Sequence, residues 1–150
     1  MQSDIFGNLM EWGDVLEKLD GLRNSKTLDE HQVGLVRILR YPRNWRLREA
    51  ALEVLGEINK PSHELVKETL NIALNEEVYL DARKMAVDAL ADLMIKDRRI
   101  RSKKEITARS RVLEKMESLM GDTQSPLLRE RIERFFKKLA NRKTPSTAHA

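Results

Sequence analysis

One spacing recurs three times along this chain, and it constrains the fold more than any other feature of the sequence. An arginine marks each copy, at Arg48, Arg83 and Arg129. Apolar residues follow each marker at the third, seventh and tenth positions, which is the spacing of one helix face. These positions hold Ala51, Leu55 and Ile58, then Ala86, Leu90 and Leu93, then Ile132, Phe136 and Leu139.

Apolar residues also precede each marker by 13, 10 and 9 positions, so a whole pair of helices repeats. A unit of this kind cannot bury its apolar face alone and has to stack on its neighbours. The sequence therefore predicts an all-α fold, an α-solenoid of three helix pairs preceded by one N-terminal capping helix. A plain helical bundle is the alternative.

Seven helices are expected from the apolar periodicity and from the residues that start or stop helices. Their approximate ranges are 5–23, 27–41, 44–58, 61–75, 79–96, 102–121 and 125–143. Asn44 and Ser125 are predicted N-caps, and Pro61-Ser62 opens the fourth helix. Residues 1–143 form a single domain in this interpretation, and the small, polar stretch 144–150 is a disordered tail.

Local signals add detail to three of these helices. Thr27 with Glu30, and Ser102 with Glu105, have the spacing of capping boxes for the second and sixth helices. Gly121 is placed as the residue just beyond the end of the sixth helix. The markers lie 35 and then 46 residues apart, so eleven additional residues, around 97–107, separate the second and third units.

Two stretches carry a resemblance to a known family. They are NWRLREAALEVLG at 44–56 and ARKMAVDAL at 82–90. Both resemble the second helix of short bacterial HEAT repeats, in which Asp-x-x-Val-Arg-x-x-Ala-x-x-Ala-Leu-Gly recurs. The resemblance covers residues 28–96 well and reaches residue 140 more weakly, because Ile132 and Phe136 replace small residues. At the position of the turn aspartate the chain has Asn44, Tyr79 and Ser125 instead.

The resemblance implies stacked antiparallel helix pairs, with the first helices on a convex side and the second helices lining a concave side. It also implies that the recurring arginine ties neighbouring units together through buried polar contacts. The motif indicates a fold and hardly any function.

Charged residues at the fifth and ninth positions after each marker are expected to face outward on the concave side. They are Glu53, Glu57, Asp88, Asp92, Arg134 and Lys138, and Glu49 extends the first row. This surface should be acidic over two units and basic over the third, which favours a partner protein with a basic segment. The alternative is a solvated helix face of mixed charge.

A second candidate is a basic strip in the connection between the second and third units. It consists of Lys96, Arg98, Arg99, Arg101, Lys103 and Lys104, and the one acidic residue in this stretch is Asp97. Phosphate backbones attract such a strip, so a nucleic-acid adaptor is an alternative function. Cations that complement the C-termini of helices give the same pattern. No aromatic residue lies between the bases, as a stacking platform for single strands would require.

A third candidate combines arginine with tryptophan. Arg43, Trp45 and Arg46 have the composition of an interaction hot spot. Packing of Trp45 beneath the helix that caps the solenoid is the other interpretation, and we prefer it slightly.

Catalysis finds little support in the sequence. The chain has no cysteine and three histidines, at 31, 63 and 149, and it has no Gly-rich phosphate loop and no metal-ligand spacing. His63-Glu64 is one His-Glu pair, whereas HEAT-like di-iron hydroxylases need four, so a HEAT-like lyase or hydroxylase is a remote alternative. We expect no cofactor, no metal and no membrane span, and a cytoplasmic, non-catalytic scaffold or adaptor that binds another protein. The adjacent Phe135 and Phe136 could expose a ring and promote dimerisation.

Overall fold

The computed structural model describes residues 4–96 and 103–143, which form helices and no strands. The predicted disordered tail at 144–150 lies outside these residues. Seven α-helices follow one another, with two short 3₁₀ turns, η1 (Leu28–His31) and η2 (Leu55–Glu57). The helices are α1 (Trp12–Ser25), α2 (Gln32–Leu39), α3 (Trp45–Val54), α4 (His63–Leu74), α5 (Leu80–Lys96), α6 (Lys103–Asp122) and α7 (Pro126–Lys143).

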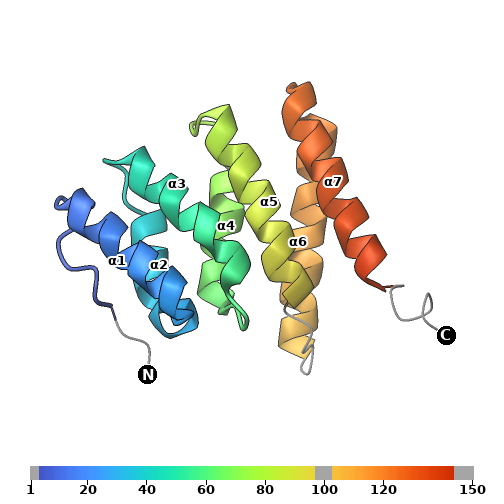
Figure 1. Ribbon diagram of the computed structural model, residues 1–150. Helices are drawn as coiled ribbons and strands as arrows, with labels where there is room; N and C mark the ends of the chain where they lie inside the picture. The colour runs from blue at the N-terminus through green and yellow to red at the C-terminus, as the bar shows by residue number, and fades with distance from the viewer. Residues whose placement is uncertain (1–3, 97–102, 144–150) are drawn as a thin grey trace.

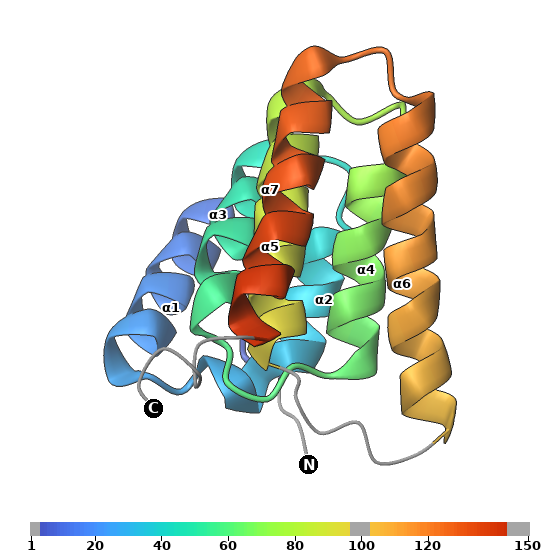
Figure 2. The same ribbon diagram turned by 90° about the vertical axis from the view of Figure 1, so that its right-hand side faces the viewer.

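The helices lie in two layers that alternate along the chain. Helices α1, α3, α5 and α7 are side by side in one layer, and α2, α4 and α6 form the other (Figures 1 and 2). We call these the odd-helix layer and the even-helix layer. Helix α5 is central, since it packs against α3, α4 and α7. The core fills the space between the layers, because each helix turns one apolar face inward.

Three predicted helix starts are present. Asn44 and Ser62 accept hydrogen bonds from the backbone N–H groups of Leu47 and Leu65, at 3.3 and 3.2 Å. Ser125 accepts one from the N–H of Leu128 at 3.2 Å, with Pro126 as the first residue of α7. Each cap satisfies a donor that the first turn of a helix otherwise leaves without an acceptor.

Three other local predictions differ from the structure or lie outside it. The side chain of Thr27 makes no capping hydrogen bond, so the expected box with Glu30 does not form. Gly121 lies within α6, which continues to Asp122, and it does not adopt the left-handed conformation of a residue beyond a helix end. Ser102, the other predicted box residue, lies outside the described residues.

The first helix begins seven residues later than predicted. Gly7 has a φ of +64°, in the left-handed region that glycine enters readily, and this turn separates residues 4–11 from α1. The segment still packs on the protein, because Phe6 and Leu9 are buried. Ile5 and Trp12, by contrast, are exposed.

The N-terminal segment is held against α2 by polar and apolar contacts. Arg37 donates two hydrogen bonds to the carboxylate of Asp4, at 2.6 and 2.9 Å. The Arg37 guanidinium holds the pKa of Asp4 below its usual value through this bond. The ring of Phe6 lies directly over Gly34, where any side chain would meet it. Residues 4–11 thus cover a face of α2 that the stacking leaves without a helix.

The repeat register predicts the core well. Eight of the nine apolar positions that follow the markers are buried, and all of these but Leu139 have no exposed area: Ala51, Leu55, Ile58, Ala86, Leu90, Leu93, Ile132 and Leu139. Phe136 is the exception and is partly exposed. Its neighbour Phe135 is buried instead, and the two rings meet edge to face at 5.1 Å.

The marker arginines make the same hydrogen bond in each unit. Arg48 Nε donates to the carbonyl of Leu39 at 2.8 Å, and Arg83 Nε donates to that of Ala73 at 3.0 Å. Arg129 Nε donates to the carbonyl of Met120 at 3.3 Å. Each acceptor lies near the end of the first helix of the same pair, where carbonyls lack helical partners.

These bonds join the two helices within a pair. The resemblance had implied contacts between neighbouring units, whereas the marker side chains bond to the backbone within their own pair. Burial also lowers the pKa of Arg48 and Arg83 below the usual guanidinium value, as expected for side chains that are partly removed from water. A partly desolvated guanidinium that is hydrogen-bonded to the backbone has a structural role, because it joins the two helices of its pair.

Candidate functional site

Most acidic residues of the predicted concave surface are paired within the chain. Asp88 pairs with Arg131, and Asp92 accepts a hydrogen bond from Lys138 at 2.7 Å. Both pairs link α5 to α7 across the odd-helix layer. These carboxylates are therefore already neutralised by the next helix of the layer, as far as an exposed pair allows.

The rest of that predicted surface is more varied. Glu57 pairs with Arg23 of α1, and Arg134 pairs with Glu130 of its own helix at 3.3 Å. Glu49 is partly buried and Glu53 is exposed. Among the described residues no ion pair involves either of these two. Two of the five acids predicted for this surface thus lie outside its ion pairs.

The predicted hot spot is divided between two contacts. Trp45 is half-buried, meets Tyr79 edge to face at 5.1 Å, and lies under the Arg48 guanidinium at 3.9 Å from the ring centre. Arg46 instead lies over the ring of Trp12 on α1. Trp45 therefore packs within the chain, as the second interpretation predicted. Its partner, however, is Tyr79 at the start of α5 rather than the helix that caps the solenoid.

Arg43 is exposed beside the N-terminal segment, where it lines a shallow depression with Met10 and Tyr41.

The predicted basic strip is only partly described. Arg98, Arg99 and Arg101 lie outside the described residues. Lys96 donates to the carbonyl of Gly56 and so joins α5 to the preceding unit. Lys103 and Lys104 are exposed at the start of α6.

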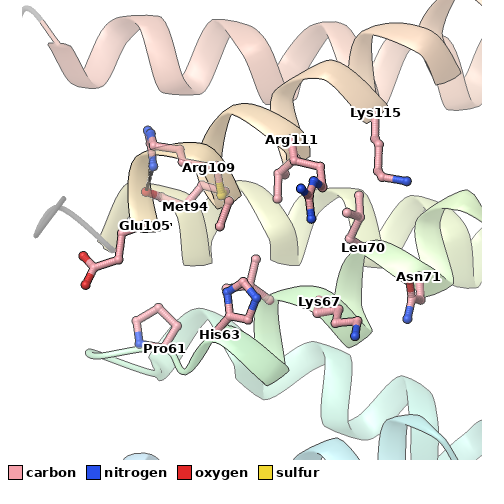
Figure 3. Close-up of a pocket in the computed structure, with 13 residues that line it drawn as sticks. Pro61, His63, Lys67, Leu70, Asn71, Met94, Glu105, Arg109, Arg111 and Lys115 are labelled. Atoms are coloured by element: carbon pink, nitrogen blue, oxygen red, sulfur yellow. Dashed lines mark hydrogen bonds between the residues drawn. The ribbon is translucent and has the colours of Figure 1, made fainter. Parts of the chain in front are cut away.

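A concave feature with an apolar floor lies in the even-helix layer. Helices α4 and α6 make far fewer contacts with each other than α5 and α7 do, and a groove of about 660 Å³ opens between them (Figure 3). The floor is apolar and reaches through the layer to a side chain of α5. It consists of Val66, Leu70, Met94, Ala108 and Val112.

The rim of the groove is basic on both sides. Lys67 extends from α4, and Arg111 and Lys115 extend from α6 (Figure 3). No ion pair or hydrogen bond of these three side chains is found within residues 4–96 and 103–143. Glu105 and His63 lie at the end where both helices begin. The cationic groups thus stand around an apolar floor without a partner from the described part of the chain.

Polar contacts fix both walls of the groove. Arg109 donates to the carbonyl of Met94 at 3.0 Å, which joins α6 to the end of α5. On the other wall, Gln32 donates to the carbonyl of Lys60 at 2.9 Å and accepts from the N–H of Ser62 at 2.7 Å. These bonds position the turn that starts α4, so the groove has defined sides.

Charge is segregated around α4. Glu64 and Glu68 both pair with Arg40 of α2, at 3.3 and 3.0 Å. Lys67 lies on the other flank of the helix, facing the groove. The acidic side of α4 is therefore used for packing of the layer, and the basic side faces the groove.

Within residues 4–96 and 103–143, no three His, Cys, Asp or Glu side chains gather closely enough to hold a metal ion. His63 is exposed at the start of α4, as expected for a surface histidine. None of the helices in the described ranges combines the length and the apolar character needed to cross a membrane.

Comparison of the chain with protein-family models, with curated proteins and with solved structures returned no match.

Sequence reasoning did not find the groove residues. Lys67, Arg111 and Lys115 lie on first helices of the units, whereas the predicted surface lies on the second helices. The additional residues around 97–107 lengthen the helix that forms one wall, but their number does not indicate a groove.

Proposed function

We propose that this chain is a non-catalytic protein-binding module built as a HEAT-like α-solenoid. Its pairs are α2 with α3, α4 with α5, and α6 with α7, and α1 caps the first pair. The alternating layers and the repeated arginine bond support this architecture. Solenoids of this kind bind other macromolecules along their extended surfaces.

The binding site in this proposal is the groove between α4 and α6. One observation carries it: an apolar floor is bordered by Lys67, Arg111 and Lys115, which have no ionic partner among the described residues. Apolar surface and unpaired charge are both more stable when a partner covers them. A nucleic acid would use the charges and leave the apolar floor without a role.

The odd-helix layer is a second candidate surface, because Glu53 is exposed and outside the ion pairs of that layer. A basic partner segment on this face remains a prediction. A nucleic-acid adaptor that uses the strip around Lys103 and Lys104 remains one as well.

Site-directed photo-crosslinking separates these surfaces. The chain has no cysteine, so one introduced cysteine carries a benzophenone reagent at a single position. Lys67→Cys and Arg111→Cys place the reagent at the groove. Glu53→Cys and Glu133→Cys place it on exposed positions of the odd-helix layer. All four variants would be irradiated in extract of the native host.

We expect the same protein to be crosslinked from positions 67 and 111 and not from 53 and 133. Crosslinking from position 53 alone would show that the binding site lies on the odd-helix layer. Nuclease-sensitive products from positions 67 and 111 would show that the groove binds a nucleic acid rather than a protein.

A further inference from the structure

The dimensions of the groove limit what it can hold. Its lining residues recur along α4 from His63 to Asn71 and along α6 from Glu105 to Lys115. At 1.5 Å per helical residue these walls extend for about 12 to 15 Å. That length matches two to three turns of a helix, or about eight to ten residues.

The walls also determine the backbone conformation of an occupant. Each wall runs from the first turn of its helix toward the middle, and beyond the first turn the N–H and C=O groups are bonded within the helix. Along most of its length the groove therefore offers no free backbone partners of the kind that the edge of a sheet has. A segment that lies on the apolar floor has to satisfy its own backbone groups, and a helix does this internally.

The floor and rim together define the side chains of such a helix. Val66 and Leu70 on one wall and Val112 on the other require apolar anchors along a single face. Helix-in-groove recognition supplies them at positions i, i+3, i+4 and i+7. Basic side chains on both rims favour carboxylates on both flanks of that face.

We propose that the groove binds an acidic amphipathic helix of about eight to ten residues from a partner protein. Its apolar face covers the floor, and its flanking Asp and Glu side chains meet Lys67 on one rim and Arg111 and Lys115 on the other. This proposal rests on the proposed function and adds the chemistry of the partner to it.

A defined peptide tests this chemistry without the natural partner. The probe is a fluorescein-labelled helical 14-mer with leucine at i, i+3, i+4 and i+7 and glutamate on both flanks. We expect saturable binding by fluorescence anisotropy. Two control peptides change one property each: one replaces every glutamate by lysine, and the other keeps the composition but scrambles the leucine positions. We expect both controls to bind at least tenfold more weakly.

Variants of the protein locate the peptide. Arg111→Glu combined with Lys115→Glu should weaken binding at least tenfold, and Lys67→Ala alone should weaken it severalfold. The matched control is Arg134→Glu with Lys137→Glu on α7, which makes the same change in net charge at exposed positions. It should leave the affinity within about twofold. Circular dichroism melting curves establish that each variant is folded.

Three results would overturn the proposal. These are equal binding of the lysine peptide, equal binding of the scrambled peptide, and equal loss of binding in the α7 control. Single-stranded DNA and vesicles of anionic phospholipid serve as competitors, and tighter binding of either at the groove would also overturn it. If crosslinking succeeds at positions 67 and 111 while the peptide fails, the proposed function stands and only the acidic helix is wrong.

Discussion

Replacing Leu90 by alanine should lower the free energy of unfolding by about 2 to 5 kcal/mol. Leu90 has no exposed area and lies on α5, the helix that packs against α3, α4 and α7. The substitution removes apolar contacts from the buried face of this central helix and leaves a cavity that rigid helices close only in part. The measurement is urea unfolding followed by circular dichroism.

Leu127→Ala is the matched control for this substitution. Leu127 is 52% exposed on α7, so the same change in side chain should alter stability by less than about 0.5 kcal/mol. Similar effects at the two positions would show that α5 is not the centre of the core. The repeated spacing would then not identify the buried residues.

Replacing Gly34 by alanine should destabilise the protein, although alanine favours helix over glycine by about 1 kcal/mol. A Cβ atom at this position would lie 2.5 Å from Cδ2 of Phe6, so the ring would have to leave its site. Losing the burial of a phenylalanine costs about 3 kcal/mol. The net effect expected is therefore a loss of about 2 kcal/mol.

The effect of Gly34→Ala on the free energy of unfolding should change sign when the ring of Phe6 is absent. In a Phe6→Ala background, Gly34→Ala should stabilise the protein, by at most about 1 kcal/mol, because the ring is gone and the helix preference outweighs the remaining contact with Oδ1 of Asp4 at 3.0 Å. Gly21→Ala in α1 is a control in which a Cβ meets nothing within 4 Å, and it should be stabilising in both backgrounds. A Gly34→Ala effect that keeps its sign would mean that residues 4–11 do not cover α2 in solution.

The sequence predicted the helices and their buried faces because both depend on local spacing. Burial repeats with the period of the helix, so the apolar positions that follow Arg48 and Arg83 are enough to identify the core. Capping residues such as Asn44 and Ser125 could be recognised because they act within one turn. The start of α1 was predicted wrongly because apolar residues keep the helical spacing from Ile5 onward, although the backbone turns at Gly7 and becomes helical only at Trp12.

The site was harder to predict, for a different physical reason. The spacing of charges placed Asp88 and Asp92 on an outward surface, but spacing alone does not distinguish a partner protein from a base on the next helix. Arg131 and Lys138 turned out to be those bases. The groove depends on how far α4 and α6 separate, which is a tertiary distance. Nothing in the local pattern of Lys67 or Arg111 reports that distance.

Binding in the groove is the central claim, and methyl NMR tests it most directly. The acidic amphipathic 14-mer would be titrated into the full chain with labelled valine, leucine and alanine methyl groups. We predict that the methyl signals of Val66, Leu70 and Val112 shift and saturate at one equivalent of peptide. The signals of Leu127 and Ala140 on α7 should stay unchanged. Shifts concentrated on α7, with Val66 and Val112 unmoved, would contradict the account.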